Sequence, residues 1–262
     1  MRFDILTIFP ELLLSPLQEG IIRRAIRDEK IEVAIHNIRD FTIDKQAMTD
    51  DRPFGGGEGM VMKPEPIAAA LDKVEEEAGP GRVVFLSPQG RTLTQAKAVE
   101  LAAVDHLVLV CGRYEGVDER VVSLYGGEEI SIGDYILTGG ELAAMVLIDV
   151  VTRLQPGVLG CADSAERDTF SRGILKHPQY TRPREFRGLE VPEELLSGDH
   201  GAVKDWRLAA AVRQTLAKRP ELLARLDFSA AEKKVLVKAG LWAAIERIAN
   251  STYDDHSAEA EE

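Results

Sequence analysis

Residues 83–111, VVFLSPQGRTLTQAKAVELAAVDHLVLVC, contain the pattern that decides the fold of this chain. Two apolar runs, 83–86 and 107–111, have the length and the β-branched content of buried strands. Between them, residues 95–103 show the apolar spacing of a helix, and Thr94 is placed to cap that helix. A strand, a helix and a second strand in this order predict two parallel strands joined by a helical crossover.

The same alternation continues on both sides of this segment. We predict further strands at residues 2–9, 31–38 and 130–132, and further helices at residues 17–27, 68–77 and 141–152. The last of these is apolar enough to be buried on most sides. Alternating strands and helices predict an α/β fold, with a mainly parallel sheet covered by helices on both faces.

The composition changes near residue 155. Residues 155–192 are rich in Gly, Pro, Arg and Asp and show no sustained period, which is typical of a linker or a functional segment. Helical spacing returns at residues 203–217, 220–226 and 230–248. We therefore predict an α/β domain (1–160), a flexible interdomain linker (161–192), a small helical domain (193–250) and a disordered acidic tail (251–262).

The formal net charge of −12 argues, on average, against a polyanionic partner, but the charge is unevenly distributed. Residues 167–187 carry six lysines or arginines against two acids, which fits an anion contact as well as a solvated linker. Cys111 and Cys161 lie far apart without metal-ligand spacing, which favours a reducing compartment. Neither a leader sequence nor a membrane span is evident, so we expect a soluble cytoplasmic protein.

Three glycine-containing loops follow predicted parallel strands, at the sheet edge where α/β proteins usually bind ligands. They are residues 87–91 (SPQGR), 112–116 (GRYEG) and 131–140 (SIGDYILTGG). Glycine lets a ligand approach the backbone, whose N–H and C=O groups can bind the edge of a flat heterocycle. One such loop alone would be interpreted as a tight turn, whereas three together favour a binding site.

A fourth loop, residues 48–60 (MTDDRPFGGGEGM), has four glycines in five positions. It is expected either to close over a substrate or to be a plain connector. The sequence contains none of the signatures of dinucleotide-binding, P-loop, zinc-protease or α/β-hydrolase sites, which disfavours those classes of enzyme.

Five motifs, RPFGGGEGM, LSPQG, CGRYEG, SIGDYILTGGE and HPQYTRP, resemble those of the bacterial tRNA (guanine-37-N1)-methyltransferase family, in the same order. The resemblance covers residues 1–226. It implies a trefoil-knotted parallel-sheet methyltransferase domain, a flexible linker and a small α-helical C-terminal domain. It also implies a homodimer with an active site shared between the subunits. Glu58 and Ala143 depart from the residues that are common in the family motifs.

The resemblance implies that S-adenosylmethionine binds in the knot. The implied contacts come from all three loops: Leu86, Ser87, Pro88, Gly112, Tyr114, Glu115, Ile132, Gly133, Tyr135, Ile136, Leu137, Gly139 and Gly140. Backbone contacts should dominate, in agreement with the interpretation of the glycines. For Ile132 and Leu137, packing in the core is an equally good interpretation.

Two catalytic residues are also implied by the resemblance. Methyl transfer to guanine N1 requires loss of a proton, and Asp168 in SAERDTF matches the family's general base. Arg153 matches an arginine that stabilises negative charge on guanine O6, with a structural ion pair as the alternative. The family reaction depends on Mg²⁺, which Glu115 or Asp168 could face, but no ligand spacing identifies a metal site.

The implied partner is the anticodon stem-loop of tRNA, bound through phosphate contacts and stacking. Candidate contacts are His177, Tyr180, Arg182, Arg184, Lys204, Trp206 and Arg207, of which Trp206 fits the core equally well. Two alternatives stay open. One is a knotted methyltransferase that acts on another RNA position, such as a ribose 2′-hydroxyl, and the other is a cofactor- or RNA-binding module without catalysis.

Overall fold

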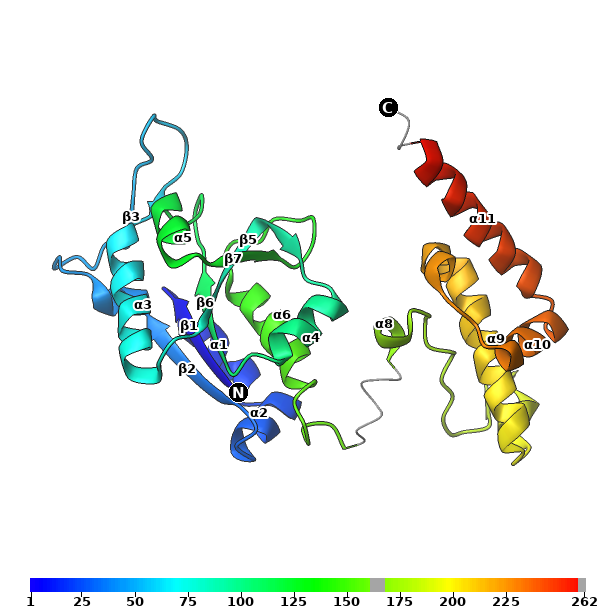
Figure 1. The fold of residues 1–262 in the computed structure, drawn as a ribbon. Coiled ribbons are helices and arrows are strands. Elements are labelled where there is room, and N and C mark those ends of the chain that lie inside the picture. The colour runs from blue at the N-terminus through cyan, green and yellow to red at the C-terminus, as the bar shows by residue number, and fades with distance from the viewer. Residues whose placement is uncertain (161–167, 259–262) are drawn as a thin grey trace. The chain divides into compact units, whose positions relative to one another are not determined.

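A five-stranded parallel sheet is the framework of the first of two units into which the chain divides (Figure 1). The computed structural model describes residues 1–160 and 168–258, and the units are Met1–Ala165 and Glu166–Glu262. The strands are β1 (Arg2–Thr7), β2 (Glu32–Asn37), β5 (Arg82–Thr92), β6 (His106–Cys111) and β7 (Glu128–Ser131), in the order β2-β1-β6-β5-β7. All four neighbouring pairs are parallel, so the predicted parallel sheet is confirmed.

Helices cover both faces of this sheet, as the alternation predicted. One face carries α1 (Glu11–Leu17), α2 (Gly20–Arg27), α4 (Gln95–Ala102) and α6 (Glu141–Thr152), and the other carries η1 (Ile38–Phe41), α3 (Pro64–Ala78) and α5 (Glu119–Tyr125). Strand β6 supplies side chains to both cores: Leu107 and Leu109 to the first, Val108 and Val110 to the second. Successive side chains of a strand point to opposite faces, so an entirely apolar strand is buried on both sides.

Several elements differ from the sequence-based prediction. The helix predicted at 17–27 corresponds to α2, which begins only at Gly20, where a φ of +61° separates it from α1. Helices α1 and α5 were not predicted. Strand β5 runs on to Thr92, so the loop predicted at 87–91 lies inside it as an irregularity, because Ile130 of β7 pairs with both Leu86 and Arg91.

The second unit is helical apart from a small hairpin. Its elements are α8 (Thr169–Arg172), β8 (Glu185–Phe186), β9 (Leu189–Glu190), η2 (Glu193–Leu196), α9 (His200–Lys218), η3 (Pro220–Arg225), α10 (Ala230–Lys238) and α11 (Trp242–Ala258). The helix predicted at 230–248 is interrupted at Gly240, where φ is +71°. The cap predicted at Ser229 is confirmed, since its side chain and that of Glu232 form a capping box.

The core of this unit draws on the predicted linker as well as on the helices. Ile174 packs with Leu208, Val212 and Leu236, and the backbone N–H of Leu175 donates to Thr215 Oγ1 at 3.0 Å. The domain boundaries stay predictions. The start of the predicted linker, 161–167, and the end of the predicted tail, 259–262, lie outside the described residues.

A buried carboxylate ties three strands together within the first unit. Asp4 of β1 is fully buried, and its oxygens lie 2.6 Å from Arg2 Nε, 2.6 Å from His36 Nε2 and 2.9 Å from His106 Nε2. Burial alone would raise the pKa of this carboxyl, but hydrogen bonds from His36, Arg2 and His106 outweigh it and hold the pKa far below its usual range. The ionised carboxylate therefore stabilises the sheet.

Asp4→Asn should lower the free energy of unfolding at pH 7 by about 3 kcal/mol, because Arg2 and both histidines lose a buried charged partner. Because the folded-state pKa is depressed, the contribution of Asp4 is present above the unfolded pKa of about 4 and is lost as the pH falls below it. Urea unfolding from pH 7 to pH 3 measures both effects, with exposed Asp40→Asn as the control. Equal stability of the two variants would contradict this role.

Candidate functional site

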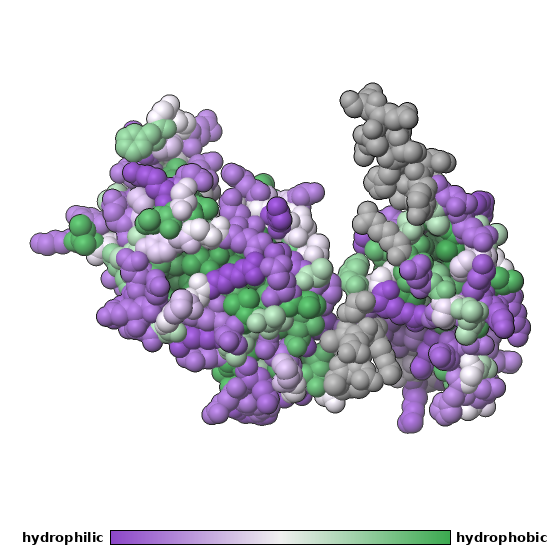
Figure 2. All heavy atoms as spheres, viewed as in Figure 1, coloured by the Kyte–Doolittle hydropathy of each residue, from purple (hydrophilic) through white to green (hydrophobic). Residues whose placement is uncertain are grey.

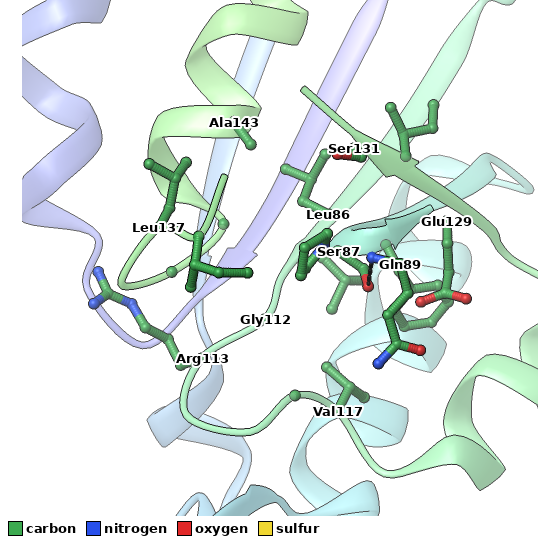
Figure 3. Close-up of a pocket in the computed structure, with 18 of the residues that line it drawn as sticks. Leu86, Ser87, Gln89, Gly112, Arg113, Val117, Glu129, Ser131, Leu137 and Ala143 are labelled. Carbon is green, nitrogen blue, oxygen red and sulfur yellow. Dashed lines mark hydrogen bonds between the residues drawn. The ribbon is translucent and has the colours of Figure 1, made fainter. Parts of the chain in front are cut away.

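One pocket lies at the irregularity within β5 and at the carboxyl ends of β6 and β7, where the three glycine-containing segments meet (Figure 3). All thirteen residues that the resemblance assigned to the cofactor line it. Other residues also line it: Gln89, Arg113 and Ser131 belong to the predicted loops but had no assigned contact, and Val117 and Glu129 lie outside those loops. In Figure 3, Leu137 and Ala143 lie at one end of the pocket, and Gln89 and Glu129 lie at the other.

The segments that follow β6 and β7 are in direct backbone contact. Gly140 N–H donates to the carbonyl of Gly112 at 2.9 Å, and Arg113 and Gly139 form an isolated antiparallel bridge. A Cβ added at Gly140 would lie 2.8 Å from Cys111 Cα and 3.1 Å from Gly112 N. Because these neighbours are backbone atoms, the pocket wall has no room for a side chain at this position.

Gly140→Ala should therefore destabilise the protein by about 1–3 kcal/mol, the usual cost of overpacking. Gly160→Ala is a matched control, because a Cβ there would meet nothing within 4 Å. Thermal unfolding of the two variants measures the difference. Equal melting temperatures would show that the contact between the two segments is looser than 2.8 Å implies.

The segment between β7 and α6 is held in a tight turn that leaves its backbone facing the pocket. Ser131 Oγ accepts from Gly133 N–H at 3.1 Å and lies 3.0 Å from the carbonyl oxygen of the same glycine. Gly133 itself has a φ of +148°. Tyr135 N–H donates to the same carbonyl at 2.9 Å. The side chains of Tyr135 and Ile136 remain exposed, so backbone and apolar groups, not charges, dominate this edge.

An ion pair buried beside the pocket joins these elements. Glu141 is 1% exposed and lies 2.9 Å from Arg113 Nη2, while Thr7 Oγ1 donates to its other oxygen at 2.7 Å. Arg113 Nη1 also donates to the Thr138 carbonyl at 3.0 Å. These contacts fix the segment after β6 to the start of α6. Both charged residues lie inside motifs that had been recognised, CGRYEG and SIGDYILTGGE, but their pairing had no signal in the sequence.

Cys111, at the end of β6, is not a candidate nucleophile. Burial, together with the neighbouring Glu141 carboxylate, raises the pKa of its thiol well above the usual range. A thiol reacts as its thiolate, so a raised pKa leaves it inert at neutral pH.

The fourth glycine-rich loop is attached to the pocket through its base. Strands β3 (Asp50–Asp51) and β4 (Val61–Met62) form an antiparallel hairpin around it. Glu115 N–H donates to the Met60 carbonyl at 2.9 Å, and Met62 N–H donates to the Gly116 carbonyl at 2.9 Å. A Cβ added at Gly59 would lie 2.5 Å from Glu115 Oε1. The hairpin is therefore an extension of the pocket-lining segment, not a separate connector.

The two predicted catalytic residues belong to different units. Arg153 is the C-cap residue of α6 in the first unit, and its backbone N–H donates to the Asp149 carbonyl at 3.1 Å. Asp168 is the N-cap residue of α8 in the second unit, with Oδ1 at 3.7 Å from Lys176 Nζ. Their catalytic roles stay predictions.

Two aromatic side chains of the second unit lie against Trp206. Its ring lies 6.1 Å from the rings of both His177 and Tyr180, in edge-to-face geometry. Tyr180 remains 49% exposed, and Trp206 is half-buried. The predicted cations, Arg182, Arg184, Lys204 and Arg207, are all exposed. The sequence left open whether Trp206 lies at the surface or in the core. In the structure it is half-buried and packs against the rings of His177 and Tyr180.

Within residues 1–160 and 168–258, no three His, Cys, Asp or Glu side chains are grouped so that they could hold a metal ion, and we therefore assign no ligands to Mg²⁺. No helix in that part of the chain combines the length and the apolar character needed to cross a membrane.

The chain is similar to known proteins over most of its length. The family model described as tRNA (Guanine-1)-methyltransferase TrmD matches residues 1–225. A tRNA (guanine-N(1)-)-methyltransferase of Citrifermentans bemidjiense is 52% identical, over 91% of this chain and 96% of the relative. Proteins of the same name from Dehalococcoides mccartyi and Lactiplantibacillus plantarum are each 51% identical, over 90% of this chain and 96% of each relative.

Proposed function

The chain belongs to the tRNA (guanine-1)-methyltransferase family, and we propose that it transfers a methyl group from S-adenosylmethionine to N1 of guanine 37 in tRNA. The observation that carries the proposal is the pocket: every cofactor residue implied by the sequence motifs lines the same cavity. The names of the relatives favour a guanine N1 acceptor over the two alternatives, a ribose 2′-hydroxyl and binding without catalysis.

The chemistry of the pocket lining suits S-adenosylmethionine. Backbone groups at Ile132, Gly133, Leu137 and Gly139 are proposed to bind the adenine edge, which needs donors and acceptors but no charge. Leu86 and Leu137 offer apolar surface to the ring. When bound, the cofactor supplies a methyl group that is activated by a positively charged sulfur. The close approach of Gly140 to Cys111 supports this assignment, since it leaves backbone without a side chain at that point of the cavity wall.

Asp168 is proposed to accept the N1 proton of the target guanine, and Arg153 is proposed to stabilise the negative charge that results. N1 becomes nucleophilic when it loses its proton, and the Asp168 carboxylate accepts that proton. Negative charge then develops on O6, where the Arg153 guanidinium stabilises it. Lys176 Nζ lies 3.7 Å from Asp168 Oδ1 and is the cation that the structure places beside the proposed base. The magnesium dependence implied by the resemblance stays a prediction.

The exposed basic and aromatic surface of the second unit is proposed to bind the anticodon stem-loop. Arg182, Arg184, Lys204 and Arg207 offer phosphate contacts, which position an RNA. Tyr180, supported by Trp206, offers an exposed ring for an unpaired base. With such a substrate, a cytoplasmic location is the natural expectation.

We further propose the homodimer and the trefoil knot that the resemblance implies. Helices α1 and α6 pack together and expose Leu12, Leu142 and Val146, and Figure 2 shows hydrophobic surface over this region of the first unit. A second copy of the chain would cover these side chains, and sedimentation at micromolar concentration tests this. The knot is proposed from the resemblance, and the segments after β6 and β7 are in direct backbone contact.

A methylation assay tests the proposed function. Purified protein, labelled S-adenosylmethionine and a tRNA transcript with guanine at positions 36 and 37 should give labelled tRNA. Binding of both ligands without any transfer would instead support the binding-module alternative.

A further inference from the structure

The tip of the β3–β4 hairpin, residues 52–60, presents a phenylalanine to solvent. Phe54 is 99% exposed, and the described structure gives its ring no packing partner of the kind that buried aromatic residues have. Gly55, Gly56 and Gly59 follow it with φ of +85°, +78° and +81°, and a Cβ added at Gly55 or Gly56 would meet nothing within 4 Å. The segment that follows Phe54 therefore consists mainly of glycines, whose backbone can change conformation easily.

The base of the same hairpin is fixed. Met62 is fully buried in the core below α3, and its carbonyl accepts from Asp118 N–H at 3.1 Å. Together with the bonds at Met60 and Gly116, this joins the hairpin to the segment that lines the pocket. In Figure 1 the tip stands clear of the rest of the first unit, beyond β3. The base of the hairpin is therefore fixed beside the pocket, whereas its tip carries an exposed ring.

We propose that Phe54 stacks on an unpaired base of the tRNA substrate adjacent to the methylated guanine. The inference rests on the proposed function, because it takes RNA as the substrate of this pocket. Sequence-specific recognition of RNA relies on unstacked bases that stack on aromatic side chains. A ring that is open on both faces and flanked by glycines can accept a flat base while the backbone stays close to it.

The charges of the tip favour a base over the other possible occupants. Over the hairpin, residues 50–62, Arg52 is outnumbered by Asp50, Asp51 and Glu58, so this segment binds phosphates poorly. A contact with a second copy of the chain would need a contiguous apolar patch, whereas the residues around Phe54, 52–59, are Arg52, Pro53, Glu58 and four glycines. Stacking on a base requires only the ring.

Three substitutions at this position separate stacking from general hydrophobic contact. Phe54→Ala should raise KM for tRNA by roughly 5- to 150-fold, the range expected for loss of one stacked base, with KM for S-adenosylmethionine unchanged. Phe54→Trp should retain wild-type KM, and Phe54→Leu should resemble Phe54→Ala. Ile43→Ala is the control, since Ile43 is equally exposed but lies outside the hairpin.

Transcripts with a single abasic nucleotide identify the base. The penalty of Phe54→Ala should disappear on the one transcript that lacks the stacked base and persist on the others. An unchanged KM for tRNA in Phe54→Ala, full rescue by Leu, or an effect confined to S-adenosylmethionine would each overturn the inference. A wild-type protein that methylates no tRNA would show instead that the proposed function itself has failed.

Discussion

Asp168→Asn should lower kcat of methyl transfer by at least about 100-fold, with KM for both substrates within a few-fold of wild type. Asparagine has the size of aspartate and keeps one of its acceptor oxygens, but it cannot accept the N1 proton at neutral pH. An effect on kcat without an effect on binding marks an interaction made only in the transition state. Single-turnover methylation with saturating tRNA measures the chemical step directly.

The control for this variant is Asp227→Asn, an exposed aspartate of the same unit. Asp168 is the N-cap residue of α8, but its side chain makes no capping hydrogen bond, so loss of the helix should not complicate the result. Turnover at the wild-type rate in Asp168→Asn would refute its assignment as the base. A rise in KM for tRNA at unchanged kcat would make it a binding residue.

Arg153→Ala should also lower kcat strongly, by about 10²- to 10³-fold, the usual cost of removing one donor that stabilises a developing oxyanion. Arg153→Lys should restore only part of the rate, because lysine keeps the charge but lacks the planar fork of donors. The ratio of kcat for the two variants therefore separates charge from geometry.

Arg153 also ends α6, so its structural contribution needs its own measurement. A cation at a helix C-terminus stabilises the helix by about 0.3–1 kcal/mol, which is far too little to abolish folding. Urea unfolding of Arg153→Ala should show a loss of this size. A large loss of stability with wild-type kcat would favour the structural ion pair over the role at O6.

The elements that sequence reasoning predicted are those with a strong local signal. Apolar runs such as 107–111 are buried on both faces of a sheet, and Thr94 and Ser229 cap helices as their positions indicated. The pocket was also predictable, because parallel strands bring their carboxyl ends to one edge and three glycine-containing segments follow them.

The features that were missed depend on contacts between distant residues. Arg113 and Glu141 are 28 positions apart, and nothing in either motif shows that they form a buried pair. For the loop at residues 48–60, the sequence left closure over a substrate and a plain connector both open, and it gave no sign of the bonds from Met60 and Met62 to the pocket segment. Helix α5 is too short for its periodicity to stand out. Asp168 had no local signal and was singled out by its motif alone.

Mapping the methylated nucleotide tests the central claim most directly. Two tRNA transcripts, one with guanine and one with adenine at position 37, are incubated with the protein and labelled S-adenosylmethionine, then digested and analysed by mass spectrometry. We predict 1-methylguanosine at position 37 of the first transcript and only background label in the second. Undiminished transfer to the adenine transcript, or a methyl group on a ribose 2′-hydroxyl, would contradict it.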